Sequence, residues 1–171
     1  MTQKLIFRGE KKMNTWFCKA TLAAAVTSLT FVAASPAQAE ECSNASLKGK
    51  YAQTISGQLL PGPSVVLPQI GVAMTKFDGK GKFTQRDFVV IDGSPTSSGF
   101  APETGTYAIH SDCTGTAIIN YPDGSWIALE LVITNHGREF RTVVSALTMG
   151  GNPVPVNIGS SGMRVGDEDG D

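Results

Sequence analysis

The sequence predicts an all-β protein, a small closed antiparallel barrel of about eight strands with up-and-down connectivity. Short runs rich in β-branched and aromatic residues recur along the chain, and turn-forming sequences separate them. The 19 glycines and 9 prolines are scattered so evenly that no long face of 3.6-residue period remains. Closure of such a meander would remove the exposed strand edges. A two-sheet β-sandwich is the alternative.

Each expected strand ends at a recognisable turn or loop. Asp78-Gly79-Lys80-Gly81 is a hairpin signal, because glycine accepts the positive φ that such turns need. The segment 60–68 contains three prolines and predicts a loop or an irregular edge. A single helical turn is expected within 43–50. The expected strands are 49–59, 69–77, 82–91, 105–110, 115–121, 125–134, 138–148 and 156–165.

The first 39 residues have the pattern of a signal peptide. Five basic residues precede the uncharged apolar run 20–34, and Ala37-Gln38-Ala39 matches a small-residue cleavage site. The apolar run of about 15 residues is shorter than the roughly 20 that span a bilayer. We therefore expect export to the periplasm or beyond, a single barrel domain over 40–165, and a disordered acidic tail over 166–171.

Charge and composition exclude several classes of partner. Residues 40–171 hold 9 basic and 14 acidic side chains, a net charge of −5. Such a protein has no basic field to attract nucleic acid or an anionic membrane. The sequence also contains no phosphate-binding loop and no metal-ligand spacing, so no cofactor, metal or nucleic acid is predicted.

Two cysteines remain after the predicted cleavage site, Cys42 and Cys113. In an exported protein two cysteines most simply form one disulfide. Two free thiols are the alternative that the residues leave open. Asp112, beside Cys113, is expected to accept backbone N–H groups in a turn.

Several motifs carry a resemblance to known proteins. The segments Cys42–Tyr51, Phe77–Gly81, Gly105–Tyr107 and Asp112–Gly115 resemble the signatures of a group of small exported bacterial proteins of unknown function. The pattern of that group is similar to lipocalin-like and allene oxide cyclase-like barrels. The resemblance implies a calycin-like, eight-stranded barrel and a Cys42–Cys113 disulfide. It brings no catalytic motif to any position of this chain, and the Gly-x-Trp motif of lipocalins is missing.

The strand 125–134 contains the candidate ligand-binding residues. One face of it carries a carboxylate among apolar side chains. If this face lines the lumen, Glu130 is a buried acid that needs a partner such as Arg141 or Arg86; if it faces solvent, Glu130 is ordinary. The candidate ligand-lining residues are Trp126, Ala128, Glu130 and Val132.

Three functions are compatible with these observations. The first is binding of a small apolar molecule in the barrel lumen, without catalysis. The second is a structural or protein-interaction module of the cell envelope. The third is a cyclase or isomerase that uses a lumenal carboxylate such as Glu130. No catalytic residue is assigned, because neither His110 nor any serine lies in a recognisable catalytic motif.

Overall fold

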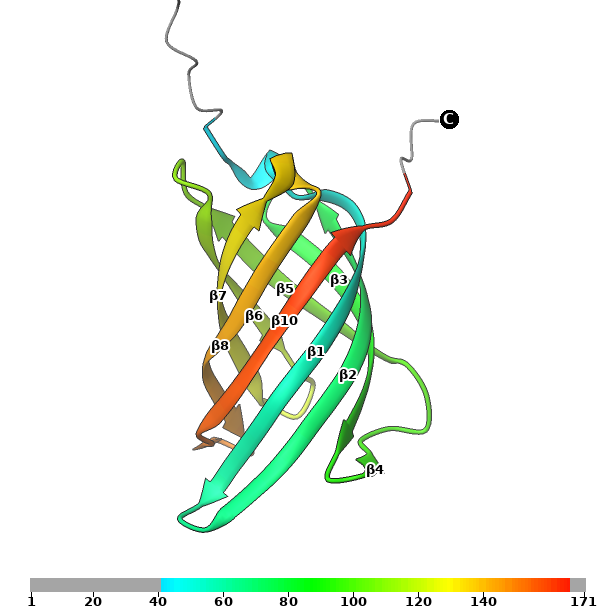
Figure 1. Cartoon of the computed structure of the whole chain (residues 1–171), viewed down its shortest axis with the longest axis vertical. Helices are drawn as coiled ribbons and strands as arrows, with labels where there is room; N and C mark the ends of the chain where they lie inside the picture. The colour runs from blue at the N-terminus through cyan, green and yellow to red at the C-terminus, as the bar shows by residue number, and fades with distance from the viewer. Residues whose placement is uncertain (1–40, 167–171) are drawn as a thin grey trace, which may run out of the picture. The chain divides into compact units, whose positions relative to one another are not determined.

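Eight long antiparallel strands close into a barrel in the computed structural model, which describes residues 41–166 (Figure 1). The long strands are β1 (Lys48–Gly62), β2 (Val65–Asp78), β3 (Lys82–Ile91), β5 (Ala101–Ile109), β6 (Thr114–Asn120), β7 (Trp126–Thr134), β8 (Glu139–Met149) and β10 (Val156–Arg164). The short elements are the 3₁₀ turns η1 (Asn44–Ser46) and η2 (Asn135–Gly137) and the two-residue strands β4 (Ser94–Pro95) and β9 (Asn152–Pro153). The predicted signal peptide, 1–39, and nearly all of the predicted tail lie outside the described residues.

The barrel is closed by its last long strand. β10 pairs with β1 from Tyr51↔Arg164 to Leu59↔Val156, and it also pairs with β8. Each long strand from β2 to β8 pairs with the long strands before and after it in the chain. The up-and-down closed barrel is therefore confirmed, and the two-sheet sandwich is excluded. No helix within the described residues is long and apolar enough to cross a membrane.

The segment 60–68, predicted as a loop or an irregular edge, is largely the irregular outer end of a long β1–β2 hairpin, so only the loop alternative is wrong. β1 runs on to Gly62 and β2 begins at Val65, with a register irregularity between Leu59 and Gly62. The hairpin extends beyond the end of the β2–β3 ladder, whose last pair is Gln69 with Ile91. Because this extension lacks a full ladder on its outer sides, prolines without an N–H are tolerated in it.

One end of the barrel is filled by aromatic side chains. Tyr51 and Phe140 are almost fully buried, and Phe77 packs edge-on against both of them and against Tyr107. Two inward-facing glycines, Gly105 and Gly162, make room for these rings. A Cβ on Gly105 would lie 2.2 Å from the Phe83 ring, and one on Gly162 would lie 2.3 Å from the Phe140 ring. This pairing of barrel glycines with cross-strand aromatic rings fixes a dense plug.

The segment before β1 covers the plugged end. Leu47 is fully buried, and the hydroxyl of Tyr107 donates hydrogen bonds to the carbonyl oxygens of Asn44 (3.0 Å) and Leu47 (2.9 Å). The Asn44 side chain in turn accepts the Ile109 N–H at 2.8 Å. The η1 segment is thus held to the end of β5 by hydrogen bonds.

A disulfide joins Cys42 and Cys113, as the sequence and the resemblance predicted. It links two residues 71 positions apart, with a Cα–Cα distance of 4.9 Å. The turn that carries Cys113 also has the predicted geometry, because Asp112 accepts the Thr114 N–H at 3.0 Å and the Thr114 hydroxyl at 2.6 Å. The disulfide fastens the start of the described chain to the β5–β6 turn.

Candidate ligand-binding lumen

The inside of the barrel holds a cavity of about 630 Å³ between the aromatic plug and the opposite end. The strands line it with the inward half of their alternating side chains. Thr96, Asp123 and Met149 also line it and are exposed loop or strand-end residues. The cavity therefore reaches the surface at the end opposite η1, where β4, β9 and the β6–β7 turn lie (Figure 1).

The strand β7 presents the other face to this cavity from the one that the sequence suggested. Ile127, Leu129 and Leu131 line the lumen, whereas the four candidate ligand-lining residues do not. Those four are Trp126, Ala128, Glu130 and Val132. The alternation of β7 was predicted correctly; of the two faces that the sequence left open, the one proposed as ligand-lining points outward. Both faces are largely apolar, so the composition of β7 alone does not show which one points inward.

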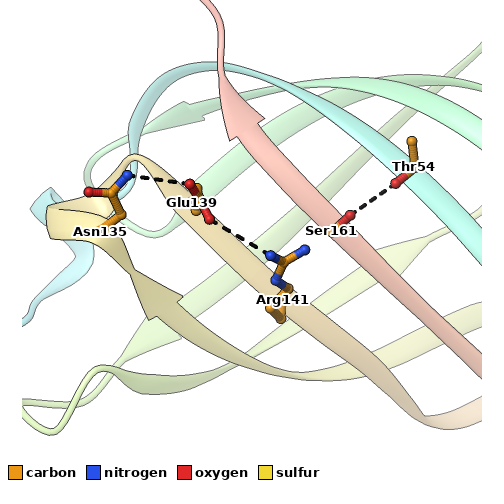
Figure 2. A network of polar contacts seen from close by, with 5 residues as sticks. All are labelled: Thr54, Asn135, Glu139, Arg141 and Ser161. Atoms are coloured by element: carbon orange, nitrogen blue, oxygen red, sulfur yellow. Dashed lines mark hydrogen bonds and ion pairs between the residues drawn. The ribbon is translucent and has the colours of Figure 1, made fainter.

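Glu130 is exposed on the outside of the barrel, which removes it as a lumenal acid or base. Its suggested partner Arg141 also lies outside and pairs with Glu139 at 3.8 Å (Figure 2). Glu139 accepts a second contact from the Asn135 amide at 3.3 Å. The Arg141–Glu139 ion pair on this surface contributes about 0–1 kcal/mol.

A belt of polar side chains crosses the lumen below the aromatic plug. The Thr75 hydroxyl donates to Gln85 Oε1 at 2.7 Å, and the Gln53 amide donates to the Thr75 hydroxyl. On the other side Thr142 and Ser160 share a hydrogen bond of 2.8 Å, and the Ser160 hydroxyl donates to Gln53 Oε1 at 3.4 Å. The belt comes from β1, β2, β3, β8 and β10. Because its members form hydrogen bonds with one another, their burial avoids the free-energy penalty of polar groups left without a partner.

The belt ends in two buried carboxyl groups, Asp87 on β3 and Glu103 on β5. Both side chains are 8% exposed. Gln85 Nε2 donates to Glu103 Oε2 at 3.0 Å. Burial, and after it the negative charge of Asp87, raise the pKa of Glu103 to about 7. Burial likewise raises the pKa of Asp87.

Tyr121, just after β6, completes this acidic corner. Its hydroxyl hydrogen-bonds with Glu103. Burial first, and then the charges of Glu103 and Asp87, raise the pKa of the Tyr121 hydroxyl. The tyrosine therefore stays a neutral donor at any ordinary pH.

The arrangement can do two things chemically. With one proton held between Asp87 and Glu103, the pair offers both a hydrogen-bond donor and an acceptor to a molecule in the lumen. With both groups ionised, it offers concentrated negative charge in a cavity whose walls are mostly apolar. Within the described residues no cluster of three or more His, Cys, Asp or Glu side chains has the arrangement of a metal site.

The sequence contained partial signals for this corner. Phe83, Gln85 and Asp87 share one face of an expected strand, since they lie two residues apart. The phenylalanine at the start of that face marks it as inward. Glu103 was missed because the expected strand began only at residue 105. By the two-residue period, however, Glu103 shares a face with Gly105 and Tyr107, and Tyr107 is buried.

No protein-family model matches the chain, and no curated protein matches its sequence. Among solved structures the chain is similar to that of the S-type phycobiliprotein lyase CPES from Guillardia theta, with 8% sequence identity and a TM-score of 0.48. The match covers 73% of this chain and 92% of that chain. At this level the likeness carries no argument about ligand or activity.

Proposed function

We propose that this protein is exported and that its barrel binds a small, predominantly apolar molecule in the lumen. The observation that carries the proposal is the cavity of about 630 Å³. This volume lies within the range of roughly 300–1,000 Å³ found for small-molecule sites, which are mostly apolar with a few placed polar groups. A barrel of eight strands is just wide enough to hold one such ligand.

The walls of the cavity match this kind of ligand. Apolar side chains from six strands line the cavity. They are Ile55, Val89, Ile119, Ile127, Leu129, Val144, Leu147 and Ile158. Contact with these walls would remove apolar ligand surface from water. Each Å² removed would stabilise the complex by about 25 cal/mol. The polar belt would orient the ligand and exclude molecules without a matching group.

A pair of neighbouring residues on β6 allows a direct test. Ile119 faces the cavity and is 5% exposed, whereas Ile118 faces outward and is 42% exposed. Ile119→Trp would fill part of the lumen, and Ile118→Trp would add the same side chain outside it. We expect Ile119→Trp to weaken binding of the neutral dye Nile red about tenfold or more, and Ile118→Trp to change it less than about twofold.

The dye titration has clear readings. Leu129→Trp, on β7, repeats the lumenal change at a second position in case Ile119→Trp does not fold. Equal dye binding by the lumenal and the outward variants would contradict lumenal binding. Native mass spectrometry of protein purified from its own host is the matching search for a natural ligand.

Export rests on the sequence of 1–39 and is supported by the disulfide, because disulfides form and persist in oxidising compartments. The expected mature protein begins at Glu40. Intact-mass measurement of protein recovered from the periplasm or medium of its host checks this directly. An N-terminus upstream of residue 30, or recovery only from the cytoplasm, would contradict it.

The alternative role, a structural or protein-interaction module, draws on the outer surface of the barrel. Large apolar side chains are exposed there on β2 and β10, at Ile70, Val72, Met74 and Met163. Such patches are often interaction sites. Failure of every small molecule to enter the lumen would favour this role over ligand binding.

A further inference from the structure

The lumen carries negative charge without any basic side chain to balance it. Three acids line the cavity, Asp123 near the mouth and Asp87 with Glu103 deeper inside. Among the described residues that line it there is no lysine, arginine or histidine. The basic neighbour of the pair along β3, Arg86, lies on the outward-facing half of that strand.

The deeper pair is held in place by neutral groups. Glu103 accepts a hydrogen bond from the Gln85 amide at 3.0 Å, and its second partner is the Tyr121 hydroxyl. Gln85 is itself fixed by Thr75 at 2.7 Å. These contacts orient the carboxyl group but supply no positive charge. Ionising both acids in this site is costly unless a cation approaches them.

The position of the pair suits the head group of an elongated molecule. The aromatic plug blocks the lumen on one side of the polar belt. Apolar side chains such as Ile119, Leu129 and Val144 line the same cavity as Asp87 and Glu103. A ligand with one charged end would place that end at the pair and its apolar body along these side chains.

We propose that the lumenal ligand is an organic cation, an apolar molecule with an ammonium group that donates hydrogen bonds to Asp87 and Glu103. This inference rests on the proposed function, because it needs a lumen that admits small molecules. An ammonium group has up to three donors, enough for both carboxylates. Bonds between an ion and its counter-ion are also stronger than neutral ones, especially away from water.

The test uses three probes that share one alkyl chain and differ only in the head group. They are decylamine, decanol and decanoate, each titrated against lumen-bound Nile red at pH 8 and low salt. At this pH the amine is cationic and the acid anionic. For the native protein we expect decylamine to bind about tenfold or more tightly than decanol, with decanoate the weakest.

Variants assign the preference to the pair. Glu103→Gln, and separately Asp87→Asn, should weaken decylamine about tenfold and leave decanol within about twofold. Having two variants guards against the failure of one to fold. Glu130→Gln is the matched control, because it removes an exposed acid from the outside and should leave both affinities unchanged. A loss of decylamine binding in Glu130→Gln as large as in Glu103→Gln would show attraction to the acidic surface and overturn the inference.

The outcomes separate this inference from the proposed function. Equal affinities for decylamine and decanol, both reduced by Ile119→Trp, would leave lumenal binding in place and overturn the cationic head group. Tightest binding of decanoate would also overturn it, since the pair would then act as a proton donor. If Ile119→Trp and Leu129→Trp change the affinity of no probe, the proposed function itself fails.

Discussion

Gln85 and Glu103 are directly opposite one another on β3 and β5, and the amide of the first donates to the carboxyl of the second at 3.0 Å. Cross-strand neighbours on one face are the units that stabilise a sheet. Here the pair also joins the hydrogen-bonded belt to the acidic corner. The carboxyl group is therefore fixed in position by the ladder, while its protonation state depends on the pH.

The first prediction concerns stability against pH. The pKa of Glu103 is raised from 4.5 to about 7, so between these values the folded protein holds a proton that the unfolded chain has released. Stability therefore falls as the pH rises from about 4.5 to 7, by up to about 3 kcal/mol, and stays low above that range. Urea unfolding between pH 4.5 and 8 measures this slope. The raised pKa of Asp87 acts in the same direction.

Glu103→Gln should remove most of that slope, because glutamine keeps an oxygen that accepts from Gln85 but has no proton to lose. At pH 8 the variant should be more stable than the native protein, and near pH 4.5 the two should be nearly equal. Glu130→Gln, at an exposed position, should keep the native profile. Parallel profiles for Glu103→Gln and the native protein would show that the pKa of Glu103 is not raised by folding.

The second prediction concerns the aromatic plug. A Cβ at Gly105 would lie 2.2 Å from the Phe83 ring and 2.4 Å from the backbone oxygen of Ile118. Neither neighbour can move away without disturbing β6 or the plug, so Gly105→Ala should cost about 2–4 kcal/mol of unfolding free energy. Gly99→Ala is the control, because a Cβ there meets nothing within 4 Å. Thermal and urea unfolding of both variants measure the difference, and an equal loss in the two would contradict the predicted clash.

The fold was predictable from the sequence because its signals are local. Turn sequences such as 78–81 and two-residue alternation placed β3 correctly, over 82–91. The longer hairpin was missed because prolines usually interrupt a strand. What permits them, the absence of ladder partners beyond Ile91, becomes visible only when the neighbouring strands are placed.

The candidate site was harder to predict because it depends on which strand face points inward. Both faces of β7 carry large apolar side chains, and closing the barrel selects Leu129 and Leu131 over Trp126 and Val132. The acidic corner joins residues from two strands that only the pairing of β3 with β5 brings together. The composition of neither strand alone indicates that pairing.

The third prediction concerns the disulfide. Cys42 and Cys113 enclose a long loop of the unfolded chain, with a sequence separation of 71. Loss of the cross-link should therefore lower the unfolding free energy by about 4 kcal/mol in the chain-entropy view. Reduction of the native protein with dithiothreitol should lower its urea midpoint, and the double variant Cys42→Ser, Cys113→Ser should unfold at the lower midpoint with or without reductant. A native midpoint insensitive to reduction would contradict a stabilising bond.

The fourth prediction separates two contributions to the anchoring of residues 42–47, the segment before β1: that of its hydrogen bonds and that of the disulfide. The Tyr107 hydroxyl donates to Asn44 O and Leu47 O, and Leu47 is fully buried. Tyr107→Phe leaves these oxygens without that donor while keeping the ring in the plug, so we expect a loss of about 1–3 kcal/mol. Hydrogen exchange should also quicken at the Ile109 N–H, which Asn44 holds. Thr54→Val, which removes an exposed bond to Ser161 (Figure 2), should cost less than about 0.5 kcal/mol. If the Ile109 N–H of Tyr107→Phe exchanged at the same rate as in the native protein, the disulfide alone would hold the segment in place.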